Sequence, residues 1–382
     1  MIYLDNAATT KTAPEVVEAM LPYFSEYYGN PSSIYAIAGK SKEAITKGRE
    51  QIANVLGAKP EEIYFTAGGS ESDNWALKAT FEAYKNKGNH IITTKIEHHA
   101  ILHTCEYLEK ERGAKITYIG VDENGVVNLD ELEAAITPET ILISVMAANN
   151  EIGTIQPIKE IGRIAKEHNI LFHTDAVQAF GQIPINVDEC NIDMLSSSGH
   201  KINGPKGIGF LYIRKGVKIR SFVHGGAQER KRRAGTENVP GIAGIGLAAK
   251  TIYTDLDEKV AHMRALKQHF IEGVQKIDHT VIHGLYDETS APHIISVGFA
   301  GIRSEVLLHT LEEKGIYVSS GSACASNHPA ISGVLKGIGA GKEYLDATLR
   351  FSMSEFTTEE EIDYTLETLY NCVPMLRKYT RH

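Results

Sequence analysis

Residues 140–181 read TILISVMAANNEIGTIQPIKEIGRIAKEHNILFHTDAVQAFG, and this stretch decides the fold. Its outer parts, TILISVMAA and NILFHTDA, are apolar and β-branched at odd and even positions alike, as expected for strands covered on both faces. The segment IKEIGRIAKEH between them has the spacing of an amphipathic helix. Strand, helix and strand in this order predict one unit of a parallel sheet.

The same alternation extends on both sides, from about residue 60 to about residue 215. Five further strand-like runs lie there: EIYFTAG, HIITTKI, KITYIGV, DMLSSS and GIGFLYIR. From about residue 255 the pattern changes to a long helix, DEKVAHMRALKQHFIEGVQKI, then further strands and a last helix from about Thr358. We therefore predict an α/β fold with a large domain over residues 15–255, built on a mainly parallel sheet, and a smaller α+β domain made of residues 1–14 and 256–382.

The composition is that of a folded protein: of 382 residues, 42% are hydrophobic and 23% are charged. The net charge of -9 argues against a protein that mainly binds nucleic acid. No run approaches the roughly 18 to 20 apolar residues that cross a bilayer, and MIYLDNAATT is unlike a signal peptide. The four cysteines include no Cys-x-x-Cys pair, which argues against a metal site and a secreted disulfide framework. We expect a cytoplasmic protein without membrane or direct nucleic-acid contact.

Polar and ionisable residues follow nearly every predicted strand. In parallel sheets, ligands gather outside the carboxyl ends of the strands, where the loops converge. We therefore expect a binding site formed by five strand-end segments. They are Gly68–Glu71, Glu97–His99, Asn149–Glu151, Asp175–Gln178 and Ser198–Lys201.

The first of these segments, in FTAGGSESDN, joins a strand to a helix through two glycines. Ser70, with Asp73 three residues on, resembles a capping box and predicts that Ser70 is the helix N-cap. A helix N-terminus can hold a phosphate, and Gly68 and Gly69 would let the backbone approach it closely. The alternative is an ordinary tight turn with a capped helix. The Gly-Lys-Ser/Thr ending of a Walker loop is absent from this segment.

Two other strand ends carry groups that each have two interpretations. Asp175 would either cap the helix that follows it or hold a protonated ring nitrogen. Lys201, in SGHKINGPKG, would either be solvated, as lone lysines in glycine-rich loops usually are, or act as an amine nucleophile. A phosphate-type turn, an aspartate, a histidine and a lysine at neighbouring strand ends are together the parts of a pyridoxal 5'-phosphate (PLP) site.

Two features lie outside these strand ends. Cys324, in SSGSACASNHP, is surrounded by small residues, which is typical either of an exposed reactive thiol or of an incidental loop cysteine. The basic cluster Arg230–Arg233 would be a solvated or subunit-interface feature, or a docking site for a partner.

Ten motifs, in order along the chain, resemble those of the NifS/IscS-type cysteine desulfurases. The form SSGSAC resembles the subgroup in which the catalytic cysteine lies on a long loop. These are PLP enzymes of the class V aminotransferase fold, so the resemblance implies an aspartate aminotransferase-like, fold-type-I transferase. The motifs are YLDNAATT, GNPSS, FTAGGSESDN, IEHHA, NNEIGTIQPI, HTDAVQAFG, SGHKINGPKGIG, RAGTENVPG, SSGSACAS and RFSMSEFTTEEEID.

The resemblance implies three catalytic residues. Lys201 would be the Schiff-base lysine, and His98 would stack on the pyridine ring and transfer protons. Cys324 would be the nucleophile that takes the sulfur. Asn150 and Arg350 would hold the carboxylate of the substrate, a task that suits a guanidinium.

The resemblance also implies the residues that bind PLP. Asp175 would pair with the pyridine nitrogen of PLP, and Gln178 would donate a hydrogen bond to its phenolate oxygen. A further set would hold the phosphate, with Thr236 reaching the phosphate of the neighbouring subunit in a homodimer. The others in this set are Gly69, Ser70, Ser198 and His200.

The implied activity converts L-cysteine to L-alanine and leaves a persulfide on Cys324. The sulfur would then pass to an acceptor protein, such as an iron-sulfur scaffold or a tRNA thiolation enzyme. Two alternatives stay open. An aminotransferase or selenocysteine lyase of the same fold would not need Cys324, and a non-catalytic sulfur carrier or scaffold, docking partners through Arg230–Arg233, would bind no chromophore.

Overall fold

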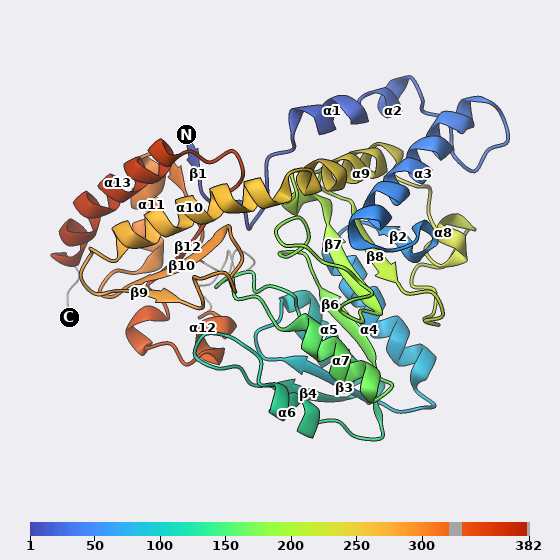
Figure 1. The fold of residues 1–382 in the computed structure, drawn as a ribbon, viewed down its shortest axis with the longest axis horizontal. Coiled ribbons are helices and arrows are strands. Elements are labelled where there is room, and N and C mark those ends of the chain that lie inside the picture. The colour runs from blue at the N-terminus through green and yellow to red at the C-terminus, as the bar shows by residue number, and fades with distance from the viewer. Residues whose placement is uncertain (321–330, 380–382) are drawn as a thin grey trace.

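The computed structural model describes residues 1–320 and 331–379 and is built around a seven-stranded sheet (Figure 1). The strand order is β2-β8-β7-β6-β5-β3-β4. Strands β4, β3, β5, β6 and β7 run parallel to one another, whereas β8 is antiparallel to both of its neighbours. The bounds are β2 (Ile63–Thr66), β3 (His90–Thr94), β4 (Lys115–Ile119), β5 (Thr140–Ser144), β6 (Leu171–Asp175), β7 (Met194–Ser198) and β8 (Gly209–Ile213).

Helices cover both faces of this sheet because its strands are apolar on both sides. Ile92 and Phe210 pack with helices on one face, while their neighbours Ile91 and Leu211 pack with helices on the other. The first face holds α1 (Pro14–Met20), α3 (Ile37–Leu56), α6 (Leu129–Ala134), α7 (Ile158–Glu167) and α9 (Val239–Tyr253). The second face holds α4 (Gly69–Tyr84) and α5 (His99–Arg112). The short helices α2 (Pro22–Ser25) and α8 (Gln228–Lys231) lie at the periphery.

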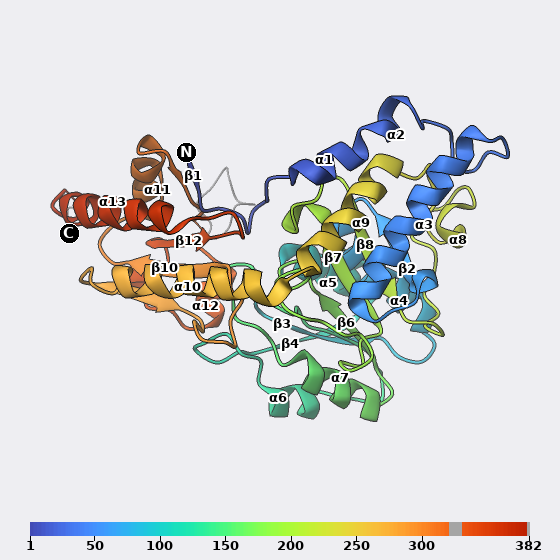
Figure 2. The same ribbon diagram turned by 45° about the horizontal axis from the view of Figure 1, so that its top comes forward.

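A second, smaller group of elements has its own core. Its antiparallel sheet has the order β12-β10-β9, and β1 pairs with β11 in parallel, so the first residues of the chain join its C-terminal part (Figure 2). The strands are β1 (Ile2–Tyr3), β9 (Thr280–His283), β10 (Ile294–Phe299), β11 (Ile316–Tyr317) and β12 (Thr348–Ser352). The helices are α10 (Leu256–Val274), α11 (Ser304–Glu313), α12 (Gly333–Gly337) and α13 (Glu359–Arg377).

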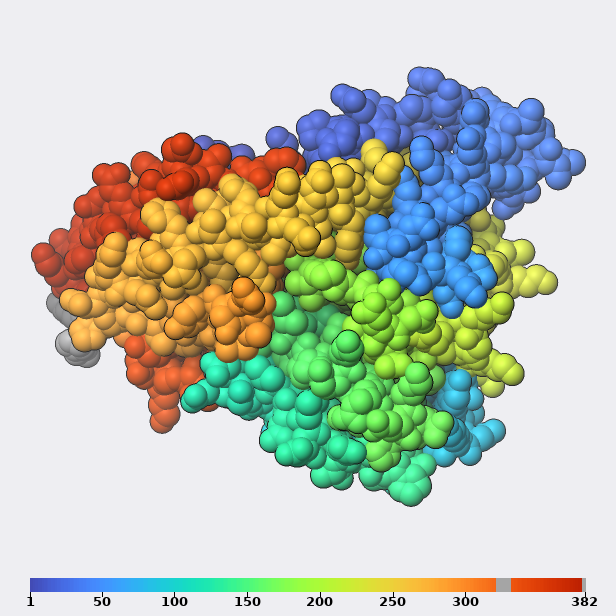
Figure 3. All heavy atoms as spheres, in the orientation of Figure 1, coloured from blue at the N-terminus to red at the C-terminus, as the bar shows by residue number. Residues whose placement is uncertain are grey.

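Helices α9 and α10 follow each other in the chain and connect the two groups. In the space-filling view they form a continuous ridge from one group to the other (Figure 3). In the part of the chain that the structure describes, no helix is long and apolar enough to cross a membrane.

The predicted α/β fold with a mainly parallel sheet is confirmed, and every strand-like run of the sequence contains an observed strand. The predicted last helix begins at Glu359 with Thr358 as its N-cap. The antiparallel direction of β8 follows from its short connection to β7, because a parallel crossover needs a dozen or more residues.

Glycines allow α3 and α9 to pack closely. A β-carbon on Gly48 of α3 would lie 2.7 Å from the main-chain oxygen of Ile242, and one on Gly246 of α9 would lie 2.4 Å from Gly48 Cα. Neither contact can be relieved by moving a side chain, so the two backbones would have to separate.

We expect Gly48→Ala to lower the free energy of unfolding by about 1–3 kcal/mol, because the added methyl group overpacks this crossing. Urea unfolding measures the change. Gly39→Ala is the matched control in the same helix, where a β-carbon meets nothing within 4 Å, and it should be neutral or stabilising by up to about 1 kcal/mol. Equal effects of the two substitutions would contradict the close crossing.

Candidate active site

A cavity of about 320 Å³ opens at the carboxyl ends of β3, β5, β6 and β7, beside β12 of the smaller group. Ten of the twelve site residues predicted from the sequence line it. Thr236 is exposed between α8 and α9 and does not line this cavity, and Cys324 lies outside the described residues. The ten are Gly69, Ser70, His98, Asn150, Asp175, Gln178, Ser198, His200, Lys201 and Arg350.

One end of the cavity is formed by the Gly-Gly turn between β2 and α4. A β-carbon on Gly69 would lie 2.7 Å from the Val177 side chain, so glycine is needed where this turn meets the segment after β6. Ser198 and His200 lie across from the turn and share a second hollow with it. Burial lowers the pKa of His200 to about 4, so its ring is neutral at physiological pH.

The prediction that Ser70 caps α4 is wrong. The helix begins at Gly69 with Gly68 as its N-cap, and no side chain caps it. Glu71 instead accepts a hydrogen bond from Ala67 N at 3.0 Å. Asp73 is 1% exposed, since it turns toward the sheet interior, where it lies 3.7 Å from His173 Nε2.

Asp175 ends β6 inside the cavity and is 5% exposed. Its Oδ1 accepts from Val177 N at 2.9 Å in a local turn. The alternative that Asp175 caps a helix is wrong, because no helix directly follows β6. Burial raises the pKa of Asp175, although the nearby His98 and Lys201 oppose this. A buried carboxyl group of this kind is suited to a cationic partner such as a protonated ring nitrogen.

His98 is the N-cap of α5, and its Nδ1 accepts from Ala100 N at 3.1 Å. The neutral ring therefore carries its proton on Nε2. Burial lowers the pKa of His98, and the positive charge of Lys201 adds to this, although Asp175 opposes it. Ligand atoms of His98, Asp175 and Asp73 all lie within 4.8 Å of one another.

Asp73 completes this cluster and was missed as a site residue by the sequence, which indicated only a cap. Burial raises the pKa of Asp73 well above its ordinary value, and the neighbouring Asp175 raises it further. Two adjacent buried carboxyl groups are costly to charge at the same time, so burial and the neighbouring Asp175 both favour the protonated form of Asp73. No sequence signal separates this role from capping, because the contact with β6 is tertiary.

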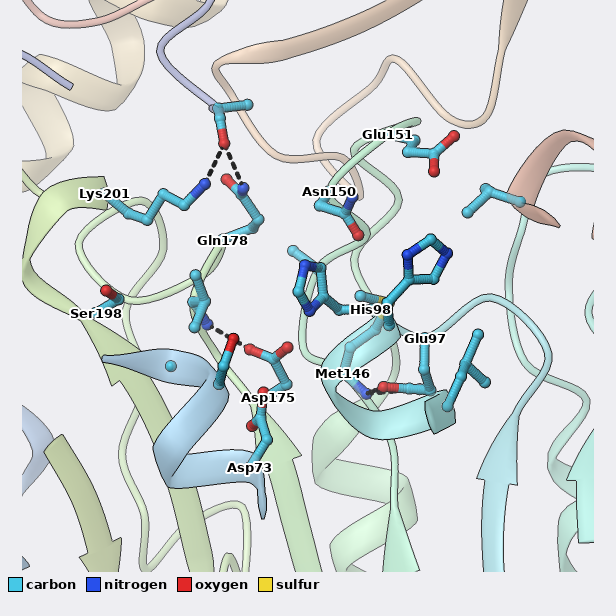
Figure 4. A pocket seen from close by; sticks show the side chains of 18 of the residues that line it. Asp73, Glu97, His98, Met146, Asn150, Glu151, Asp175, Gln178, Ser198 and Lys201 are labelled. Atoms are coloured by element: carbon cyan, nitrogen blue, oxygen red, sulfur yellow. Dashed lines mark hydrogen bonds between the residues drawn. The ribbon is translucent and has the colours of Figure 1, made fainter. Parts of the chain in front are cut away.

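Glu97 is a second residue whose function the sequence did not indicate. It is 3% exposed and accepts hydrogen bonds from Met146 N at 3.0 and 3.1 Å (Figure 4). It also accepts one from Thr94 Oγ1 at 2.8 Å. Burial raises its pKa to about 8 despite these donors. Since Glu97 directly precedes His98, these bonds fix the position of the imidazole relative to the end of β5.

Lys201 lies in the short 3-10 helix Gly199–Lys201 directly after β7. Its Nζ donates to the main-chain oxygens of Ala7 and, at 2.9 Å, of Ala8, and Gln178 Nε2 donates to Ala7 O at 2.9 Å (Figure 4). Lys201 is thus held inside the cavity, and the interpretation as a solvated loop lysine is wrong.

Arg350 enters the cavity from β12 and is 3% exposed. Its guanidinium donates to Asn150 O at 2.7 Å and to Asp5 Oδ1 at 2.9 Å. Among the described residues, its Nε has no hydrogen-bond partner. A buried guanidinium with an available N–H can bind a carboxylate of a small ligand.

The arginines of the basic cluster are largely engaged within the chain. Arg230 lies 4.0 Å from the ring centroid of Tyr64 and donates to Ile63 O at 2.8 Å, and Arg233 pairs with Glu71 at 2.8 Å. These contacts cover the outer edge of β2. They favour a structural role for the cluster over a free docking surface.

Comparison with known proteins identifies relatives over nearly the whole chain. The family model Aminotransferase class-V matches residues 2–365. The cysteine desulfurase IscS of Methanosarcina thermophila is 54% identical, with 98% of this chain and 93% of the relative covered. The cysteine desulfurase IscS of Clostridium botulinum is 51% identical, with 99% and 95% covered.

Solved structures give the same result. A NifS-like protein superposes with a TM-score of 0.93 at 41% identity, over 98% of this chain and all (100%) of that chain. SspA in complex with cysteine superposes with a TM-score of 0.83 at 37% identity, over 94% of this chain and 100% of that chain. The predicted PLP fold-type-I architecture is confirmed, and the chain belongs to the aminotransferase class-V family.

Proposed function

We propose that this chain is a PLP-dependent cysteine desulfurase, which converts L-cysteine to L-alanine and carries the sulfur as a persulfide on Cys324. The observation that carries the proposal is the convergence of Lys201, His98, Asp175 and Arg350 on one cavity. The relatives named cysteine desulfurase and the structural neighbour in complex with cysteine support it.

The residues of the cavity fit PLP. Asp175 offers a buried carboxyl group for the pyridine nitrogen, beside the ring of His98. Gln178 would bond the phenolate oxygen, and the Gly69 turn offers the close backbone approach that a phosphate needs. PLP, when bound, supplies a ring that withdraws electrons from the α-carbon of an amino acid. The phosphate would be held by Ser70, Ser198, His200 and, from the neighbouring subunit of a homodimer, Thr236.

The remaining chemistry belongs to side chains of this protein. Arg350 and Asn150 would hold the carboxylate of the substrate, which places its α-carbon near the amine of Lys201. Lys201 would move the α-proton, and His98, neutral through burial, would assist proton transfer. The Cys324 thiolate would form an S–S bond with the sulfur of the substrate as the C–S bond breaks, and protonation of the carbon gives alanine.

The sulfur would pass from Cys324 to an acceptor protein such as an iron-sulfur scaffold or a tRNA thiolation enzyme.

We also propose that the chain forms two domains, a large one over residues 15–255 and a small one made of residues 1–14 and 256–382. A cytoplasmic location is consistent with Cys105, Cys190 and Cys372, which are free thiols.

The purified protein should be yellow, with a visible absorbance band that Lys201→Ala abolishes. Loss of the amine should also lower the rate of alanine formation from cysteine by about 10²–10⁴-fold, because the proton transfer is lost. Absorbance spectra and an alanine assay measure both effects. Lys206→Ala, an exposed lysine nearby, is the control and should keep the band. A colourless wild-type protein would overturn the PLP assignment.

Cys324→Ala should retain the visible band but lower sulfide release from cysteine by at least about a hundredfold, since the acceptor of the sulfur is removed. Mass spectrometry of the wild type treated with cysteine should show one added sulfur on the peptide that contains Cys324. Cys190→Ala is the matched control. Full activity of Cys324→Ala would instead favour a selenocysteine lyase or an aminotransferase of this fold.

The acid side of the pH profile should depend on His98. Protonation of Nδ1 would break its hydrogen bond from Ala100 N and charge the ring beside Lys201. Burial lowers the pKa of His98 below 6.5, so kcat/KM should fall only as the pH drops below that value. In His98→Gln this fall of kcat/KM at low pH should be absent, and the rate should be about 10²–10⁴-fold lower than in the wild type. His103→Gln, exposed on the same helix, should behave like the wild type. An unchanged acid limb in His98→Gln would assign the titration to another group.

A further inference from the structure

Behind Lys201 lies a second, much smaller cavity of about 10 Å³. Lys201 lines both this cavity and the main one, and the small cavity is also lined by Gln182, from the turn after β6, and by His293, which directly precedes β10. Gln182 is 8% exposed and His293 is 3% exposed. Neither side chain has a role in the proposed reaction.

The hydrogen bonds around Gln178 determine which way its amide points. The main-chain oxygen of Ala7 can only accept, so the group 2.9 Å from it is the Gln178 amide nitrogen. Gln178 Oε1 therefore faces His293 Nε2, at 3.3 Å. Because Oε1 can only accept, His293 must carry a proton on Nε2.

His293 Nδ1 is therefore an acceptor. Burial lowers the pKa of His293 to about 3, and the positive charges of Lys267, Arg350 and Lys201 add to this, so the ring is neutral. A neutral imidazole has one N–H, which Gln178 already receives. Within the described residues no group donates to His293 Nδ1.

Gln182 presents a second acceptor of this kind. Its Oε1 is buried and likewise receives no hydrogen bond from the described residues. The two residues that carry these acceptors thus both line a cavity with room for about one water molecule. A water molecule has two O–H groups, which is the number of donors that these two atoms require.

We propose that one water molecule binds in this cavity, donating to His293 Nδ1 and Gln182 Oε1, and that His293 is a positioning residue that orients the Gln178 amide for PLP. The second part rests on the proposed function. Gln178 is then held at both ends, by Ala7 at its nitrogen and by His293 at its oxygen. The amide N–H groups consequently point to one side only.

The water site is tested by a crystal structure of the holoenzyme at about 1.5 Å resolution or better. We expect ordered density within hydrogen-bond distance of both His293 Nδ1 and Gln182 Oε1. Nitrogen-15 NMR of the histidine rings, assigned with His293→Leu, should show His293 protonated on Nε2 and not on Nδ1. A dry cavity, a protein donor in the place of the water, or the opposite tautomer would each overturn this part.

The positioning role is tested by titrating the visible band of bound PLP. His293→Leu frees the Gln178 amide, which weakens its hydrogen bond to the phenolate oxygen. We expect the midpoint of the titration to rise by about one pH unit and the dissociation constant of PLP to rise about tenfold. His293→Gln, whose amide can donate to Gln178 as Nε2 does, should restore both values to near wild type.

His283→Leu is the matched control. His283 is a second buried histidine of the same small sheet, also neutral through burial, but its Nε2 contacts Thr348 Oγ1 at 3.2 Å and it lines neither cavity. It should leave both values unchanged. Wild-type values in His293→Leu would overturn the positioning role. Failure of the wild-type protein to bind PLP would refute the proposed function, while a crystal structure of the cofactor-free protein and the NMR measurement would still decide the water site.

Discussion

The main-chain oxygen of Ala7 is the contact on which the arrangement of the site depends. It accepts from Lys201, which follows β7, and from Gln178, which follows β6, while Ala7 N donates to Ser352 Oγ on β12 at 2.8 Å. One residue near the start of the chain therefore joins two strand ends of the large sheet to the small one. Together with Ala8 O, which also accepts from Lys201, it helps to hold the lysine amine and the Gln178 amide in position relative to the guanidinium of Arg350.

The rest of the N-terminal segment strengthens this link. Thr10 Oγ1 donates to His200 O at 2.9 Å and accepts from Asn203 N at 2.8 Å, so the 3-10 turn that carries Lys201 is bound from outside the sheet. Lys201 thus approaches the cavity in one direction. A flexible amine has many rotamers, and these contacts remove most of that freedom before any ligand binds.

Burial determines the protonation states of the ionisable residues in and beside the cavity. Asp73 and Asp175 are driven toward the protonated form, whereas His98, His200 and His293 are kept neutral. A cationic ring nitrogen next to Asp175 would instead favour its ionised form, since a nearby positive charge lowers the pKa of a carboxyl group. The site is therefore arranged to hold one additional positive charge at its floor.

The sequence by itself determined the fold class and most of the cavity lining, because a parallel sheet brings the residues after its strands to one edge. Ser70, His98, Asp175 and Lys201 could be predicted for this reason. Only the tertiary structure decided which residues support them. The sequence around Ala7, Asp73 and His293 does not indicate their roles, because each of them contacts a segment that is distant in the chain. The predicted N-cap at Ser70 is wrong because α4 begins earlier, at Gly69, and Asp73 points into the interior of the sheet. Periodicity along a chain records which side of an element is buried, but not which buried groups meet.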